Sequence, residues 1–412
     1  MSWREILADA SVPARSAARE AASDQVRYFE VPTRRLLNPV RSRGDPSAAG
    51  ASLPFELTAN PFLHCEVGCV YCHARDFADR RAGGKADFDG QIFAKTGAVA
   101  ALRDEMARLV RSGQQGKAIA LGTATDPYQP LERRLKLTRG LLEVLAGVST
   151  QHGGVRLSIT TKCDLALRDL DLFQELGRRG TLQVNVSLST TDRGLAKLLE
   201  PKAPSPGRRL KLVESLARAG VPVGVYLMPI LPGITDSPRE VRASVWAART
   251  AGARFLTART LVLPGAARDS FFAWLERERP DLVKRYRRWY RTGPYVREDV
   301  EDRLRRLVEA LRRQVGLPAG LELPTAAPAA REQQLTLFDL AGASRHDPGD
   351  VARRLPGVDD PSSSTAAVFR QPGSPLSVVA RTEPRRLPVA APQPPLSIAE
   401  PVQRGEAGAD VA

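Results

Sequence analysis

Short runs of apolar and β-branched residues alternate along the middle of the chain with segments of helical periodicity. The segments between the runs space their apolar side chains three or four residues apart, and two of them open with Ser-Pro, which suits a helix N-terminus. The runs are "PFELTANPF" (54–62), "KAIALG" (117–122), "VRLSITT" (155–161), "LQVNVSLS" (182–189), "VPVGVYLMP" (221–229) and "RFLTARTLVL" (254–263). Strands that alternate with helices form parallel sheets with right-handed crossovers. The pattern therefore predicts an α/β fold of about six strand–helix units.

Side chains suited to chemistry follow each of these runs. They stand in a cysteine-rich loop and in "TATDPYQ", "TKCD", "STTD", "MPILPG" and "LPGAA". In α/β barrels the active site forms at the carboxyl ends of the strands. We therefore predict a partial (β/α)6 TIM-type barrel over residues 51–265, with one site ringed by these loops.

The flanking segments differ from this core. Residues 1–50 are polar and mixed, and we expect a loosely ordered N-terminal extension there. Residues 266–316 read as helices that pack outside or below the barrel. Residues 317–412 are rich in Pro and Ala, a composition that buries too little apolar surface to fold, so we expect a disordered tail.

Charge and cysteine use narrow the class of protein. Lys and Arg number 61 against 46 Asp and Glu, a formal net charge of +15. Such a chain favours polyanions, nucleic acid first and membrane surfaces second, although a bias in composition explains the arginines equally well. The sequence shows no apolar run long enough for a signal peptide or a membrane span. Clustered cysteines without a disulfide framework then indicate a cytoplasmic protein.

Three of the four cysteines stand in "HCEVGCVYCHAR" (64–75) with the spacing C-x3-C-x2-C. Cys65, Cys69 and Cys72 are too few for an ordinary four-cysteine zinc or iron–sulfur site. A centre with three protein ligands keeps an open position, which suits catalysis. The alternative is a structural zinc site completed by His64, His73 or Cys163 in a non-catalytic binding protein.

The cysteine spacing, with Tyr71 before the last cysteine, resembles the signature of the radical S-adenosylmethionine (SAM) superfamily. The blocks "ANPFLHCEVGCVYCHAR", "GTATDPYQPLE", "ITTKCDLALRDLDLFQEL" and "MPILPGITD", in this order, are similar to the spore photoproduct lyase-like subgroup. The resemblance implies that Cys65, Cys69 and Cys72 bind a [4Fe–4S] cluster, with SAM on the fourth iron. Reductive cleavage of SAM then yields a 5′-deoxyadenosyl radical that abstracts hydrogen from the substrate.

The same resemblance implies roles for residues in the other loops. It places Tyr71 beside the adenine of SAM, Lys162 and Ser187 at its carboxylate or ribose, and Thr123 and Thr125 in a loop that touches it. Simple packing of Tyr71 and a solvated Lys162 are the alternatives. Cys163 is a candidate catalytic hydrogen donor or, alternatively, a small buried residue. A reductant such as flavodoxin or ferredoxin is the implied electron source.

The sequence leaves two alternatives for the substrate and two for the role of one tail motif. The basic charge and the resemblance favour a nucleic-acid substrate, in DNA repair or modification, and a peptide or small metabolite is the alternative. Gln334–Phe338 reads "QLTLF", which resembles the pentapeptide that docks bacterial polymerases on the sliding clamp. Its Leu and Phe side chains suit insertion into a preformed groove. A segment that folds back onto the barrel is the other interpretation.

Overall fold

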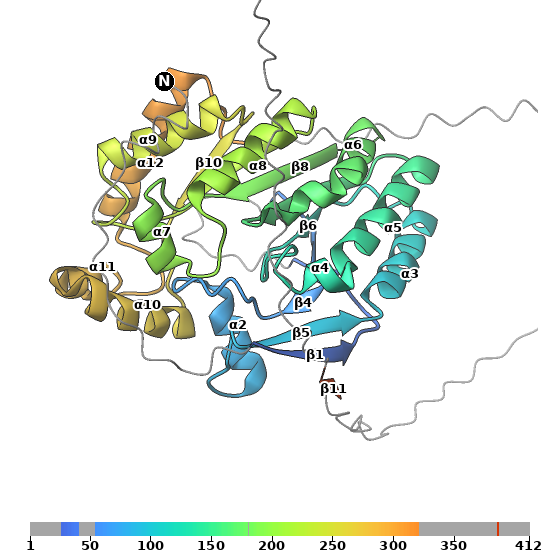
Figure 1. Cartoon of the computed structure of the whole chain (residues 1–412), viewed down its shortest axis with the longest axis horizontal. Helices are drawn as coiled ribbons and strands as arrows, with labels where there is room; N and C mark the ends of the chain where they lie inside the picture. The colour runs from blue at the N-terminus through green and yellow to red at the C-terminus, as the bar shows by residue number, and fades with distance from the viewer. Residues whose placement is uncertain (1–25, 41–53, 180, 321–384, 387–412) are drawn as a thin grey trace, which may run out of the picture.

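The computed structural model describes residues 26–40, 54–179, 181–320 and 385–386 of the chain. Its larger sheet has the strand order β10-β9-β8-β7-β6-β3-β2, in which β2 (Asn38–Pro39) pairs antiparallel with β3. Figure 1 labels β6, β8 and β10 of this sheet. Six strands of this sheet are parallel and follow one another in chain order, an arrangement compatible with the predicted partial barrel. These are β3 (Leu57–Ala59), β6 (Ile119–Leu121), β7 (Arg156–Thr161), β8 (Thr181–Ser187), β9 (Val223–Ile230) and β10 (Leu256–Thr260). The predicted α/β class with a parallel sheet is confirmed.

Helices connect these strands where the sequence predicts them. They are α3 (Ala98–Arg111), α4 (Glu132–Leu135), α5 (Leu137–His152), η1 (Asp164–Asp169), α6 (Leu170–Arg179), α7 (Arg193–Leu199), α8 (Pro206–Arg218) and α9 (Pro238–Thr250). Both Ser-Pro dipeptides begin a helix, because Ser205 and Ser237 accept hydrogen bonds from the backbone N–H groups of Arg208 and Glu240.

The C-terminal helices pack beside the last strand of the parallel sheet and over its carboxyl end. They are α10 (Gly265–Glu278), η2 (Pro280–Leu282), α11 (Val283–Trp289) and α12 (Glu298–Val315). The Tyr286 hydroxyl donates to Pro232 O at 2.7 Å, and the Tyr290 hydroxyl donates to Leu261 O at 2.8 Å. Pro232 follows β9 and Leu261 follows β10, so α11 covers the loops beyond these two strands. Helix α11 therefore lies beyond the carboxyl ends of β9 and β10, whereas the sequence led us to expect residues 266–316 outside or below the barrel.

A second, smaller sheet has no counterpart in the sequence prediction. It consists of β1 (Arg27–Pro32), β4 (Phe62–Leu63), β5 (Gln91–Thr96) and β11 (Arg385–Arg386), with β1 parallel to β5. Part of the expected loose extension over residues 1–50 is thus structured. The Glu105 carboxylate of α3 accepts backbone N–H groups from Leu36 and Leu37, both at 3.0 Å, which fixes this segment against the core.

The hydrophobic core fills the space between the large sheet and its helices. A smaller cluster of Phe62, Ile92, Ala94 and Leu131 lies under the second sheet. Within the described ranges, each helix is too short or too polar to cross a bilayer. Gln334–Phe338 lies outside the described residues.

Candidate radical SAM site

The cysteine loop runs between β4 and α2 (Ala74–Ala82) and folds back on itself. Gly68 N donates to Cys65 O, and Cys72 N donates to Cys69 O. Gly68 has φ +70°, and a Cβ there would stand 3.1 Å from a carboxylate oxygen of Asp89, so the turn requires glycine. Cys65 and Cys69 are buried and Cys72 is half-buried; all three thiols are free. The predicted ligands thus share one tight turn.

The chemistry of these thiols fits a cationic iron centre. Burial, and after it the charge of Asp126, raises the pKa of Cys65 to about 12. Burial also raises the pKa of Cys69, while Lys162 opposes the shift. Buried thiols of this kind ionise when a metal ion compensates their charge. In the part of the chain that the structure describes, no group of three His, Cys, Asp or Glu side chains could hold a single metal ion. An iron–sulfur cluster differs from a single ion, because it contains several irons.

His64 has a structural position that accounts for it without a metal. Its Nδ1 lies 2.9 Å from Gln91 O, and its ring packs against Phe88 and Phe93. His64 O in turn accepts the Thr125 hydroxyl at 2.7 Å. These contacts join the cysteine loop to β5 and to the loop after β6, so His64 positions the loop.

Asp126 joins three loops at the carboxyl edge of the sheet. Its carboxylate accepts the Thr161 hydroxyl and the Lys162 N–H, both at 2.7 Å. Its own N–H donates to Cys65 Sγ at 3.4 Å. Cys163 follows Lys162 in the same loop, and burial, followed by the charge of Asp126, raises the pKa of its thiol. The loops after β6 and β7 are thereby brought against the first cysteine.

The two predicted threonines support the loop that carries Asp126. Thr125 is buried, and its hydroxyl holds His64 O. The Thr123 hydroxyl accepts from Asn60 Nδ2 at 3.2 Å, and Asn60 also accepts the backbone N–H of Ala124. Both threonines therefore lie next to the cysteine loop, and their contact with the cofactor stays a prediction.

A buried ion pair lies beneath the other side of the cysteine loop. Glu200 accepts the Tyr71 hydroxyl, the Arg209 guanidinium and, at 3.1 Å, the Ser189 hydroxyl. Arg209 also donates to Ser187 O at 3.2 Å. Glu200 and Arg209 are each only 1% exposed. This network ties Tyr71 to the end of β8 and to α8.

Lys162 directly follows β7, and Ser187 is the last residue of β8, next to this network. Ser187 is buried at the end of β8, and Lys162 is half-buried. Burial disfavours the charge of Lys162, but Cys69 and Glu200 outweigh it and raise the pKa of the ammonium. No carboxylate among the described residues forms an ion pair with Lys162 Nζ. A protonated amine without a carboxylate partner beside a cysteine ligand suits the carboxylate of a cofactor.

Comparison with known proteins fixes the family. The model of the radical SAM superfamily matches residues 60–244, which include the cysteine loop and the loops after β6 to β9. The chain belongs to the radical SAM superfamily. This family is one of enzymes, and membership implies SAM and an iron–sulfur cluster. The predicted superfamily and enzyme class are confirmed.

Relatives and solved structures agree with this assignment. An uncharacterized protein of Mycobacterium tuberculosis is 38% identical over 291 residues, which cover 70% of this chain and 81% of that protein. An uncharacterized protein of Methanocaldococcus jannaschii is 23% identical over 214 residues, covering 52% and 71% of the two chains. Spore photoproduct lyase complexed with dinucleoside spore photoproduct superposes with a TM-score of 0.50 at 17% identity, covering 66% of this chain and 78% of that one. At 17% identity, the similarity to spore photoproduct lyase shows a shared fold and no more.

Proposed function

We propose that this radical SAM enzyme binds a [4Fe–4S] cluster through Cys65, Cys69 and Cys72 and acts on nucleic acid, in DNA repair or modification. The observation that carries the proposal is the tight turn with three free cysteines beside the unpaired ammonium of Lys162. Three thiolates leave one iron of a four-iron cluster for SAM, and Lys162 is placed to bind the SAM carboxylate.

When bound, the cluster supplies a low-potential electron and SAM supplies the 5′-deoxyadenosyl group that abstracts hydrogen. The chain's own residues hold the surrounding loops in place. Asp126 fixes the loops after β6 and β7, and Glu200 fixes Tyr71 and Arg209. Fixed buried groups exclude water from a site where a radical reacts. Tyr71 and Ser187 then line the proposed SAM site, and Thr123 and Thr125 support it.

The nucleic-acid substrate is supported by charge and by the fold. The net charge of +15 favours a polyanion. A protein of similar fold, spore photoproduct lyase, is found in complex with a dinucleoside photoproduct. We extend this type of substrate to the present chain, with flavodoxin or ferredoxin as the proposed reductant.

Anaerobic reconstitution with iron and sulfide tests the proposal. We expect about four irons per chain, and methionine plus 5′-deoxyadenosine when dithionite and SAM are added. The variant with Cys65, Cys69 and Cys72 changed to Ala should bind no cluster and form neither product. Deuterium from a labelled oligonucleotide should appear in 5′-deoxyadenosine. A protein that binds zinc and forms no 5′-deoxyadenosine would contradict the proposal.

Cys163 is the proposed hydrogen donor to the substrate radical, because it is a free cysteine in the loop after β7, next to Lys162. Cys163→Ala should keep the iron content and the formation of 5′-deoxyadenosine. It should lose the normal product, as seen by mass spectrometry of the oligonucleotide. Normal product from this variant would remove Cys163 from the reaction.

A further inference from the structure

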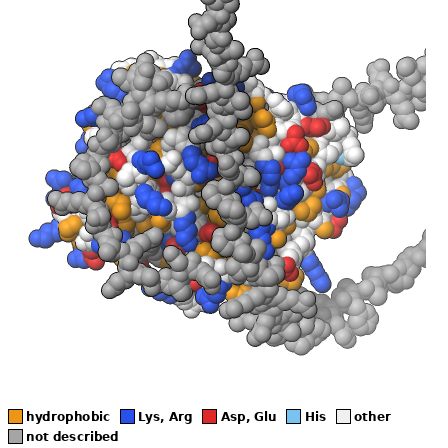
Figure 2. Space-filling model, viewed as in Figure 1, with side chains coloured by type: hydrophobic (Ala, Val, Ile, Leu, Met, Phe, Trp, Pro, Cys, Tyr) orange, Lys and Arg blue, Asp and Glu red, His pale blue; other side chains and the backbone are white. Residues whose placement is uncertain are grey.

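Helix α11 and the segment after it are rich in basic side chains. Residues 282–297 contain six Lys and Arg and no Asp or Glu. The inner side of α11 is apolar and fully buried through Tyr286, with Tyr290 just beyond the helix. The outer side exposes Lys284, Arg288 and Arg291, together with Arg285 and Arg287. Lys and Arg side chains gather where α11 lies, at the left edge of the view in Figure 2.

This helix lies on the same edge of the sheet as the radical SAM site. Tyr286 and Tyr290 bind the carbonyls that follow β9 and β10. Leu263 N donates to Pro294 O at 2.8 Å, so the segment after α11 also borders the end of β10. Helix α10, which leads into α11, contacts α2, and α2 begins just after Cys72. A molecule bound along α11 can therefore extend to the site.

Four of the five exposed cations form no ion pair with a described residue, and one of the four, Arg285, interacts with the charge of Asp281. Arg287 is paired with Glu276 at 3.2 Å. Lys284, Arg288 and Arg291 form no ion pair with any residue in the described ranges. Cations of this kind neutralise the phosphates of a nucleic acid, and the release of counter-ions from those phosphates drives binding. We call Lys284, Arg288 and Arg291 the basic face of α11.

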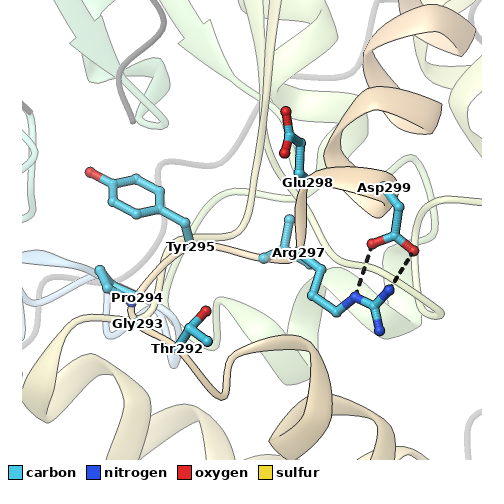
Figure 3. A pocket seen from close by; sticks show the side chains of 8 residues that line it. Thr292, Gly293, Pro294, Tyr295, Arg297, Glu298 and Asp299 are labelled. Atoms are coloured by element: carbon cyan, nitrogen blue, oxygen red, sulfur yellow. Dashed lines mark hydrogen bonds and ion pairs between the residues drawn. The ribbon is translucent and has the colours of Figure 1, made fainter. Parts of the chain in front are cut away.

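A cavity adjoins the basic face. It has a volume of about 660 Å³ and is lined by residues 292–299 (Figure 3). The Tyr295 side chain is 49% exposed there and projects away from the loop. Arg297 is held by Asp299 through contacts of 3.0 and 3.2 Å, so its charge is already compensated. The volume is that of a small-molecule site, and an exposed aromatic ring is a surface on which a base can stack.

We propose that the basic face of α11 binds the phosphates of a single-stranded nucleic acid and that one of its bases enters the cavity of residues 292–299, against Tyr295. This inference rests on the proposed function and states where its substrate binds. A base inside a duplex cannot enter such a cavity unless it leaves the stack, which favours a single strand. An anionic membrane is a poorer partner, because the apolar side of α11 is buried and cannot insert into lipid.

Binding of labelled single-stranded oligonucleotides to the unreconstituted full chain, at several salt concentrations, tests the proposal. The test variant is Lys284→Gln, Arg288→Gln and Arg291→Gln. The matched control is Arg103→Gln, Arg108→Gln and Arg111→Gln on α3, which removes the same charge on another helix. Each phosphate contact on a single strand contributes about 0.7 to the slope of log K against log salt. The test variant should therefore lower the slope by about 2, and the control should leave it unchanged.

Tyr295→Ala should weaken binding by about tenfold at an unchanged salt slope, because stacking does not depend on counter-ions. Equal slopes for the test variant and the control would overturn the proposal. So would stronger binding to phosphatidylserine vesicles than to oligonucleotides. If the wild type binds oligonucleotides through α11 but forms no 5′-deoxyadenosine after reconstitution, the proposed reaction fails and the binding surface stands. If the reconstituted enzyme forms 5′-deoxyadenosine but oligonucleotides do not bind through α11, only the proposed binding surface is refuted.

Discussion

Charged side chains deep in the protein, rather than the cysteines alone, give the site its shape. Glu200 and Arg209 are almost fully enclosed and also hold Tyr71 and Ser187 O. The charge of Arg209, followed by that of Lys162, overcomes the cost of burial and lowers the pKa of Glu200. An ion pair of this kind contributes little net stability relative to apolar residues, but the loss of one partner leaves an uncompensated buried charge.

Glu200→Ala is therefore expected to lower the free energy of unfolding by about 3–5 kcal/mol, measured by urea denaturation at neutral pH. The control is Glu309→Ala, which removes one partner of the exposed Arg305–Glu309 pair and should leave the urea midpoint unchanged. A loss of stability as small for Glu200→Ala as for the control would show that Arg209 finds another partner or reaches water.

Lys162→Ala should weaken the binding of SAM to the reconstituted enzyme by about 10- to 100-fold, the range for losing a hydrogen bond to a charged group. The iron content should be unchanged, because Lys162 is not a cluster ligand. Equilibrium dialysis with labelled SAM measures the affinity of the variant and of the wild type for SAM. Lys211→Ala, on the exposed side of α8, is the control. Equal affinity for Lys162→Ala and wild type would remove Lys162 from the SAM site.

The sequence predicted the residues of the site better than their contacts. Cys65, Cys69 and Cys72 stand within eight positions, so local spacing identified them. Glu200 and Tyr71 are 129 residues apart, and only the folded chain brings them together. For the same reason Asp126 was equally readable as a turn residue, although it connects Cys65, Lys162 and Thr161.

At the scale of the elements, local patterns were sufficient for the parallel sheet but not for the second one. The core strands lie in short runs rich in apolar and β-branched residues, and Ser205 and Ser237 mark helix starts through contacts three residues away. β1 pairs with β5, and its residues are only partly buried. Its apolar pattern is correspondingly weak, and its partner lies about sixty residues further along the chain. The pairing was therefore not readable from the sequence.

Glu105 tests how the segment of β1 and β2 is fixed. Glu105→Ala removes the acceptor for the N–H groups of Leu36 and Leu37. We expect hydrogen exchange at these two amides to accelerate about tenfold or more, while amides of β7 and β8 keep their protection. The exposed neighbour Asp104→Ala is the control. Unchanged exchange in Glu105→Ala would mean that other contacts are sufficient to fix the segment.

At the scale of the whole molecule, the tail motif Gln334–Phe338 offers a means of bringing the enzyme to DNA. We predict that the full chain retains the bacterial sliding clamp in a pull-down. Leu337→Ala with Phe338→Ala should abolish retention, because these side chains are the proposed anchors in the groove. Val368→Ala with Phe369→Ala changes a similar apolar pair elsewhere in the tail and should have no effect. Equal retention by both double variants would exclude the motif as the docking site.

The residues just after α12 have a consequence for self-association. Leu317 is buried, and Pro318 O accepts the N–H of Leu256 at 3.0 Å, at the outer side of β10. β10 is the last strand of the large sheet, and an uncovered edge strand is a template for β-aggregation. Proline has no N–H with which to extend the ladder to another chain. This short segment therefore occupies a hydrogen-bonding position on the edge of β10 that a strand of another chain could otherwise use.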